Sequence, residues 1–475
     1  MKLMIFAIDA LPPDIVRDNI EHYPNMKKLI SKGTFCDYEA YTYGYGSMDN
    51  WISLYTGLEP EVHGCIKNYF RDENRYANLN DFCDKNPFWE ELNKKNISVG
   101  VWRATATSPV QSINGYMIGG EVFYEKGIEI PYCSIDPVVH ENDKWILNEL
   151  EGKLKENPYP KSFKDKYNNY NKEEAEKVVS ELLKADYFKE GYEFLKEELK
   201  YYKTNITNVY RKKEVDVCFF YTSLIDFIGH FQMHDMNKVI MKKAIKEIDD
   251  FIGEIIKEIG PENVIVLSDH GMTAWYEHFE GYDRKVQEEL FGLSKNAFWL
   301  ENGAIVLEGR NGGLLSGCHG SRGTFIGSGP LFKNKKIKDM RTVDFYPTLL
   351  EMFDIEVPAE RQGKVLDILT KDRIKNEKIF LEEEKVNYKK IAIIQNIDIP
   401  QFNTIINKVF LNNRLSKIDV YGECRYEKAI SFNTKVDNFY DVNSTSKEEI
   451  FTKYDVVIIP YFNKKNGELK YYTLK

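Results

Sequence analysis

The chain has few of the features that mark secreted, membrane-spanning or disulfide-rich proteins. Its seven cysteines are odd in number and form no CxxC pair, so we expect reduced thiols rather than a disulfide framework. No apolar run approaches the roughly 20 residues that span a bilayer. The first residues, MKLMIFAID, enter an apolar segment without a charged leader or a cleavage site. These absences predict a cytoplasmic protein with no membrane partner.

Clustered positive charge is also absent. The formal net charge is −9, and the sequence shows no dense Lys and Arg face of the kind that binds a nucleic-acid polymer. A small anionic substrate held by metal ions is compatible with this charge. With 475 residues, 43% of them hydrophobic, the chain is long enough for one large α/β domain with insertions or for two to three domains.

Apolar runs alternate with helical patterns along residues 1–370. This alternation predicts an α/β domain with a mostly parallel sheet flanked by helices. Residues 104–120 are rich in small and turn-forming side chains, and we expect an irregular loop near the site there. The expected strands are 3–8, 97–102, 215–221, 263–267, 304–307 and 324–327, and the expected helices are 13–29, one that begins near 47, 87–92, 236–259 and 344–353.

Other regions differ in composition. Residues 121–214 are dense in Lys, Glu and aromatic side chains, with helical periodicity at 172–202, which predicts a helical or irregular cap or insertion. The charged segment 371–387 predicts a linker. Residues 388–475 repeat a strand–helix–strand pattern, with a helix expected at 402–412, and predict a small Rossmann-like α/β domain. That domain has neither a glycine fingerprint nor a catalytic cluster, so its sequence does not indicate a role.

Aspartate and histidine side chains follow several of the expected strands. Asp9 comes directly after strand 3–8. Asp226 and His230 follow strand 215–221, and their spacing of four places both on one face of a helix, where they can share an ion. Because ligands bind at the carboxyl edge of a parallel sheet, we expect these side chains to meet there. Taken alone, each motif is also compatible with a turn aspartate or a surface pair.

Two further motifs place histidines beside glycines. Asp269 and His270 end strand 263–267 and precede Gly271, which lets the backbone turn. His319 lies in GCHGSRG, where glycines allow the backbone to approach an ion closely. A polar turn is the alternative for the first motif. Aspartate and histidine together suit Zn²⁺ best and Mn²⁺ next.

The stretch YTYGYGSMDNWISLYTGLEPEVHG, residues 41–64, places Ser47 where a Gly- and Tyr-rich loop turns into a helix. A serine at a helix N-terminus is ordinarily an N-cap. Beside two divalent cations, however, a serine hydroxyl is activated as a nucleophile toward phosphorus. We assign Ser47 that role. Asp9, Ser47, Asp269 and His270 would hold one ion, and Asp226, His230 and His319 would hold the other.

Residues 1–370 contain, in order, FAIDALPPD, PNMKKLISKG, SMDNWISLYTGLEPEVHG, FWEELNKKNISVGVW, NGYMIGG, LIDFIGH, VLSDHGM, CHGSRGTFIGSGP and DFYPTLLEMF. In order and spacing these segments resemble the alkaline phosphatase superfamily, and most closely its type I phosphodiesterase/nucleotide pyrophosphatase branch. The resemblance implies that Ser47 is the nucleophile, that Asn50 hydrogen-bonds a non-bridging phosphoryl oxygen, and that all seven metal-ligand positions are filled. It also implies a phospho- or nucleotidyl-serine intermediate that water hydrolyses.

The expected function is therefore metal-dependent hydrolysis of phosphodiester or pyrophosphate bonds in small, nucleotide-like substrates. The alternatives are a phosphomonoesterase or phosphotransferase of the same superfamily, and a non-catalytic binding protein on this fold. The Cys/Ser-x-Pro-x-Arg motif of sulfatases is absent. Asp49 departs from the family pattern, which often has proline at that position. Its carboxylate would either repel a dianionic monoester or face solvent. The sequence does not indicate an oligomeric state.

Overall fold

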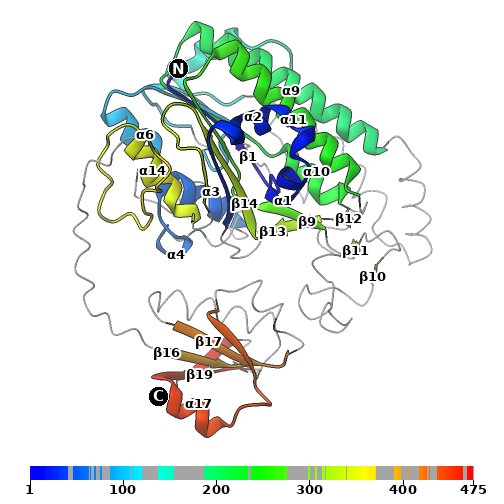
Figure 1. The fold of residues 1–475 in the computed structure, drawn as a ribbon, viewed down its shortest axis with the longest axis vertical. Helices are drawn as coiled ribbons and strands as arrows, with labels where there is room; N and C mark the ends of the chain where they lie inside the picture. The colour runs from blue at the N-terminus through cyan, green and yellow to red at the C-terminus, as the bar shows by residue number, and fades with distance from the viewer. Residues whose placement is uncertain are drawn as a thin grey trace. The chain divides into compact units, whose positions relative to one another are not determined.

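The chain divides into two compact units, which are described separately. The larger unit lies within Met1–Lys371 and the smaller one mainly within Asp372–Lys475 (Figure 1). The computed structural model describes residues 1–40, 47–63, 65, 69–70, 75–76, 86–107, 110–119, 137–154, 187–233, 237–274, 298–299, 305–307, 313–315, 317–337, 340–370, 390–396, 406, 417–424, 427, 436–463 and 468–473.

The larger unit is built on an eight-stranded sheet with the order β15-β2-β14-β8-β1-β7-β5-β6. β1 lies between β7 and β8 and is parallel to both, and β5 and β6 continue the parallel arrangement beyond β7. β14 is antiparallel to its neighbours β2 and β8. The expected mostly parallel sheet is therefore confirmed. The strands are β1 (Leu3–Ile8), β2 (Thr34–Glu39), β5 (Val99–Trp102), β6 (Gly115–Ile118), β7 (Val217–Thr222), β8 (Asn263–Leu267), β14 (Arg322–Ser328) and β15 (Lys335–Ile337).

Helices cover both faces of this sheet. Met4 and Phe6 of β1 belong to one buried cluster, whereas Leu3 and Ile5 belong to the other, as the two-residue period of a strand requires. Helices α2, α9, α10 and α11 pack on the first face and α3, α6 and α14 on the second (Figure 1). They are α2 (Pro24–Lys32), α3 (Ser47–Thr56), α6 (Phe88–Lys94), α9 (Tyr187–Lys212), α10 (Leu224–Gln232), α11 (Val239–Ile259) and α14 (Phe345–Met352).

The segment that the sequence assigns to one helix at 13–29 is divided. It forms α1 (Pro13–Asp18), a short 3-10 turn at Ile20–His22, and α2. Proline fits the first turn of a helix but not its interior, so Pro24 begins a new helix. The carboxylate of Asp249 on α11 accepts hydrogen bonds from the backbone N–H groups of Asn25 (3.2 Å) and Met26 (2.7 Å). A distant side chain therefore caps α2.

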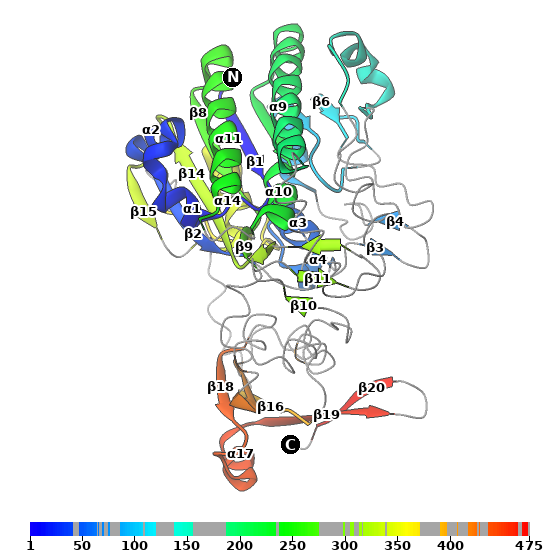
Figure 2. The ribbon, with the colours of Figure 1, turned by 90° about the vertical axis from the view of Figure 1, so that its right-hand side faces the viewer.

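Within the segment 121–214, which we expected to form a helical or irregular cap, residues 187–212 form the helix α9. This helix lies alongside α11 (Figure 2) and buries Leu195 and Ile206 in the same cluster as Phe6 of the sheet. The Lys and Glu side chains that dominate its composition lie mostly on the exposed face of the helix. Residues 121–136 and 155–186 lie outside the described residues, so a cap formed by them stays a prediction.

Residues 115–118 also differ from the sequence prediction. We expected an irregular loop over 104–120, but Gly115–Ile118 form the edge strand β6, parallel to β5 and fully buried. The strand is too short for its pattern to stand out among the turn-forming residues around it. Its place in the sheet depends on pairing with β5, which is a long-range contact.

The smaller unit contains a five-stranded sheet with the order β18-β17-β16-β19-β20. The first four strands are parallel and β20 is antiparallel to β19. The expected helix at 402–412, apart from Ile406, and the linker at 371–387 lie outside the described residues, so the Rossmann-like fold stays a prediction. The elements are β16 (Lys390–Ile394), β17 (Lys417–Gly422), β18 (Asn438–Asp441), α17 (Lys447–Lys453), β19 (Val456–Asn463) and β20 (Glu468–Thr473).

None of the helices in the described part of the chain is both long enough and apolar enough to cross a membrane.

Candidate active site

Three aspartates meet at the carboxyl edge of the large sheet. Asp9 directly follows β1 and Asp269 lies two residues after β8, while Asp226 lies in the first turn of α10, which begins two residues after β7. Since β1 is paired with both β7 and β8, these three chain segments leave the sheet side by side. The carboxyl edge is where parallel sheets bind ligands, because loops and helix N-termini converge there.

The first cluster surrounds Ser47. Its Oγ lies 3.3 Å from Oδ1 of Asp9 and 3.1 Å from Nε2 of His270. Nε2 of His270 lies 3.2 Å from Oδ2 of Asp269 and 3.5 Å from Oδ1 of Asp9. The four side chains that the sequence assigns to one ion are therefore brought together, and Asp9, Asp269 and His270 are buried.

The second cluster contains the other three predicted ligands. Oδ1 of Asp226 lies 3.4 Å from Nε2 of His230 and 3.1 Å from Nε2 of His319. The two histidine Nε2 atoms are 3.1 Å apart. The His270 and His319 rings stack with centroids 4.0 Å apart, so the two clusters adjoin. His234, which follows on the same helical pattern, lies outside the described residues.

Backbone carbonyls fix the tautomers of two histidines. Nδ1 of His270 lies 2.9 Å from the carbonyl oxygen of Gly271, and Nδ1 of His230 lies 3.1 Å from that of Gly317. A carbonyl oxygen only accepts hydrogen bonds, so each Nδ1 carries a proton and donates it. In the neutral ring the lone pair is then on Nε2, the atom that faces the aspartates, which is the arrangement of a metal-binding histidine.

Mutual repulsion and burial act on the aspartates. Burial, together with the charge of Asp226, raises the pKa of Asp9 to about 6. Burial and the charge of Asp9 raise the pKa of Asp269 well above its ordinary range. Burial also opposes ionisation of Asp226, but the neighbouring His230 and His319 hold its pKa well below the usual range. Three carboxylates this close need positive charge among them to ionise together.

The surroundings shift the pKa values of the three histidines in different directions. Burial lowers the pKa of His270. Burial and the adjacent His270 lower the pKa of His319 to about 4. Burial also disfavours the charged form of His230, but Asp226 outweighs it and raises the pKa of His230. His270 and His319 are therefore held neutral near pH 7, the form in which imidazole binds metal ions.

The residues present fit divalent cations. Oδ1 of Asp226 and Oδ2 of Asp269 are buried, and within the described residues no donor meets either atom in hydrogen-bond geometry. Two imidazole nitrogens bound to one tetrahedral Zn²⁺ lie about 3.3 Å apart, close to the 3.1 Å between His230 and His319. Candidate ligand atoms lie within 4.8 Å of one another in two groups, Asp226 with His270 and His319, and Asp9 with Asp269 and His270.

Asn50 and Asp49 lie on the nucleophile helix α3. Asn50 is buried, and its Oδ1 accepts a hydrogen bond of 3.5 Å from the hydroxyl of Thr342. Asp49 is only 2% exposed, and its Oδ1 accepts a hydrogen bond of 3.0 Å from the backbone N–H of Asn50. The alternative that Asp49 faces solvent is therefore wrong. Its carboxylate lies inside the protein, in the first turn of the helix that begins at Ser47.

Two residues of the site were missed at the sequence level. The indole Nε1–H of Trp51 and the hydroxyl of Tyr221 both donate hydrogen bonds to Oδ2 of Asp9, at 2.9 and 2.7 Å. The sequence shows only that Ser47 and Trp51 are four residues apart, a spacing that places both on one face of α3. Nothing in the sequence indicates that this face meets Asp9.

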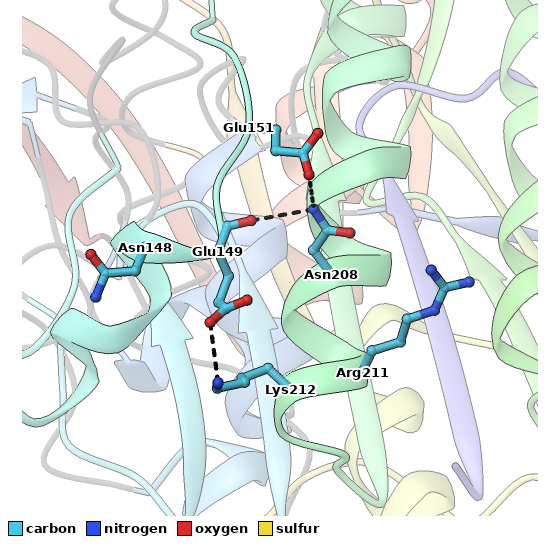
Figure 3. A pocket seen from close by; sticks show the side chains of 6 residues that line it. All are labelled: Asn148, Glu149, Glu151, Asn208, Arg211 and Lys212. Atoms are coloured by element: carbon cyan, nitrogen blue, oxygen red, sulfur yellow. Dashed lines mark hydrogen bonds and ion pairs between the residues drawn. The ribbon is translucent and has the colours of Figure 1, made fainter.

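A separate hollow of about 380 Å³ lies on the surface of the larger unit (Figure 3). Its side chains largely pair with one another, because Asn208 donates to Oε1 of Glu151 (3.0 Å) and Lys212 lies 3.5 Å from Glu149. It lies at the end of α9 from which the chain enters β7, away from the edge that carries the aspartates. Its lining residues are Asn148, Glu149, Glu151, Asn208, Arg211 and Lys212.

The mostly parallel sheet, the aspartates and histidines at its carboxyl edge and the serine beside them define an α/β protein with a candidate two-metal site. Comparison with known families gives a more specific assignment. The chain belongs to the type I phosphodiesterase/nucleotide pyrophosphatase family, whose model matches residues 3–312. The resemblance seen in the sequence motifs is thereby confirmed.

Individual relatives are distant. The chain is 24% identical over 278 residues to bis(5'-adenosyl)-triphosphatase ENPP4 of Bos taurus and 23% identical over 280 residues to that of Homo sapiens. Each alignment covers 57% of this chain and 48% of the relative, so the chain spans about half the length of these curated relatives. The solved structure of human ectonucleotide pyrophosphatase/phosphodiesterase 5 matches this chain with a TM-score of 0.44 at 17% identity. The match covers 78% of this chain and 100% of the human chain. The murine protein gives 0.46 at 16% identity with the same coverage.

Proposed function

We propose that the protein is a metal-dependent hydrolase of phosphodiester or pyrophosphate bonds in small, nucleotide-like substrates. The observation that carries the proposal is the position of Ser47 Oγ, 3.3 Å from Asp9 and 3.1 Å from His270 within a buried Asp/His cluster. Family membership supports the same reaction class. The ENPP4 relatives are named bis(5'-adenosyl)-triphosphatases, which supports a nucleotide-like substrate with a pyrophosphate bond.

The two clusters would hold two divalent cations, most favourably Zn²⁺, with Mn²⁺ as the next choice. Asp9, Ser47, Asp269 and His270 would bind one, and Asp226, His230 and His319 the other. When bound, such a pair supplies positive charge to the attacking and leaving oxygens of an in-line displacement.

Ser47 is the proposed nucleophile. Its hydroxyl releases a proton to water and its oxygen forms a bond to phosphorus, while the bond from phosphorus to the leaving oxygen breaks and that oxygen keeps the electron pair. In the second step a water oxygen forms a bond to phosphorus and releases a proton. The bond to Ser47 breaks, and the serine oxygen keeps the electron pair and takes up a proton. The N-terminus of α3, where Ser47 lies, favours the negative charge of the phosphoryl group through the helix dipole.

Asn50 is the proposed donor to a non-bridging phosphoryl oxygen. The Thr342 hydroxyl donates to Oδ1 of Asn50, so the two ends of the carboxamide can be told apart. Nδ2, at the other end, is the proposed donor. Asp49 adds a buried carboxylate in the same helical turn. That charge would disfavour a dianionic monoester more than a monoanionic diester, so we propose that diesters are preferred.

Chromogenic mono- and diester substrates, assayed with Zn²⁺ and with Mn²⁺, test this proposal. We expect faster hydrolysis of the diester, and a loss of roughly 10³-fold or more in kcat for Ser47→Ala. Ser31→Ala, on the exposed side of α2, is a matched control and should leave kcat unchanged. A large preference for the monoester would overturn the substrate assignment, and undiminished turnover by Ser47→Ala would remove the nucleophile. Wild-type protein that turns over no diester would favour a binding protein.

The cellular location stays a prediction. Cys36, Cys65, Cys218 and Cys318 are buried cysteines outside any disulfide, and Cys424 is an exposed one. Reduced cysteines of this kind support the proposal of a cytoplasmic location. The absence of a membrane partner and of a nucleic-acid partner are likewise predictions.

A further inference from the structure

We propose that Trp51 and Tyr221 are positioning residues that hold the carboxylate of Asp9 in one orientation, so that a single oxygen faces the nucleophile and the cation. The inference rests on the proposed function, because it concerns how a metal ligand is held. It assigns a role to two buried side chains that contact Asp9.

The two oxygens of Asp9 have different surroundings. Oδ2 accepts hydrogen bonds from the indole of Trp51 at 2.9 Å and from the hydroxyl of Tyr221 at 2.7 Å. Oδ1 instead lies 3.3 Å from Ser47 Oγ and 3.5 Å from Nε2 of His270. Two donors on Oδ2 compete with a cation for its lone pairs and leave Oδ1 as the ligand atom. The carboxylate is thus held for binding through one oxygen.

Trp51 also connects the ligand to the nucleophile. Ser47 and Trp51 lie four residues apart on α3, so they project from one face of the helix. Ser47 contacts Oδ1 and Trp51 contacts Oδ2 of the same carboxylate. A rotation or axial shift of α3 would therefore change both contacts at once. The indole sets the position of the nucleophile helix relative to the end of β1.

Packing holds both donors in place. Trp51 is fully buried and Tyr221 is 4% exposed. Their rings meet nearly at right angles with centroids 5.2 Å apart, and Trp51 meets Phe219 in the same way at 6.3 Å. Edge-to-face contacts of this kind restrict ring rotation. The donors come from α3 and from β7, so two separate elements fix one carboxylate.

The test substitutions remove each hydrogen-bond donor and keep an aromatic ring at the same position. In Trp51→Phe and Tyr221→Phe we expect the affinity of metal-free protein for Zn²⁺, titrated against a chromophoric chelator, to fall about 10–100-fold. We also expect kcat to fall while KM changes little, because both side chains are buried and their proposed role is to orient Asp9. Tyr221→Phe deletes one oxygen only, so it keeps the proposal testable should Trp51→Phe fold poorly.

Matched controls separate positioning from general loss of packing. Trp89 is a buried indole whose Nε1–H donates to Gln111 at 3.3 Å, and Tyr346 is a buried phenol whose hydroxyl bonds the carbonyl of Asn86 at 3.5 Å. Trp89→Phe and Tyr346→Phe should therefore keep Zn²⁺ affinity within about twofold of wild type. Melting temperatures of the metal-free proteins check that each test variant is as stably folded as its control variant.

The outcomes distinguish this inference from the proposed function. If wild type binds Zn²⁺ and hydrolyses a diester while Trp51→Phe and Tyr221→Phe match it in Zn²⁺ affinity and kcat, the positioning role is overturned and the function stands. Equal losses in the test and control variants would also overturn it, since the effect would then be general packing. If wild type binds no Zn²⁺ and no Mn²⁺, the proposed function fails and this inference with it.

Discussion

At the residue scale, the site is a set of acids and imidazoles whose protonation depends on each other. Burial raises the pKa of Asp9 to about 6 and lowers that of His319 to about 4. A raised carboxyl pKa means that the metal-free folded state binds the proton more tightly than the unfolded state. Stability from Asp9 is therefore present at low pH and is lost as the pH rises to about 6. A bound cation reverses this loss, because it stabilises the ionised carboxylate.

We therefore predict that stabilisation by Zn²⁺ increases with pH. His319 is already neutral above about pH 4. The groups whose protons still compete with the cations above that pH are Asp9, with a pKa of about 6, and Asp269 and His230, whose pKa values are also raised. The difference in melting temperature between Zn²⁺-loaded and metal-free protein, measured by calorimetry in non-chelating buffers from about pH 5 to pH 7, should rise. In Asp9→Asn the rise should be smaller, because one of these competing protons is removed while those of Asp269 and His230 remain. A difference that is the same at every pH would contradict the assignment of Asp9 as a ligand.

At the scale of elements, glycines bring α10 against the antiparallel pair of β9 (Gly271–Ala274) and β13 (Gly317–Gly320). A Cβ on Gly317 would lie 2.2 Å from the carbonyl oxygen of Gly229 on α10, and one on Gly229 would lie 2.5 Å from Met272. Only glycine permits this approach. The carbonyl of Gly317 also accepts from His230. Close packing of these elements therefore sets the 3.1 Å between His230 and His319.

Gly317→Ala should move α10 away from β13. The new methyl group meets backbone rather than a flexible side chain, so the strain cannot be relieved locally, and we expect a loss of about 1–3 kcal/mol in unfolding free energy. We also expect one of two Zn²⁺ ions per chain to bind more weakly. The measurements are chemical denaturation and a Zn²⁺ titration with stoichiometry.

Gly320→Ala is the control within the same strand. Its Cβ would be 3.3 Å from the nearest atom, so the neighbour needs to move by only a few tenths of an ångström. It should lose less stability and keep both ions. If Gly317→Ala binds both ions as wild type does, the packing of α10 on β13 does not determine the second cluster.

At the scale of the whole molecule, the features that the sequence predicts are those with a local signal. The strands around β1 are buried on both faces and therefore appear as continuous apolar runs. The spacing of Asp226 and His230 encodes a shared helix face. The family motifs predict the role of Asn50. They also predict that Ser47 lies beside metal ligands that are more than 150 residues away in the chain.

The features that the sequence does not predict depend on long-range packing. β6 exists because β5 lies beside it, and the helix α9 (187–212) packs along α11 and against one face of the sheet. The burial of Asp49 and the bond from Trp51 to Asp9 depend on where α3 lies against the sheet. The bond from Tyr221 to Asp9 depends on the pairing of β7 with β1. No periodicity or composition records these contacts, since their partners lie far apart in the chain.

The central claim is that Ser47 attacks phosphorus, and trapping the covalent intermediate tests it most directly. Metal-loaded protein is mixed with excess diester, quenched in acid at successive early times, digested and analysed by mass spectrometry. We predict that the peptide containing Ser47 carries the phosphoryl or nucleotidyl group, that fragmentation places the group on Ser47, and that Ser47→Ala carries none. Product formation with the group on another residue, or with that peptide unmodified at every time, would contradict the account.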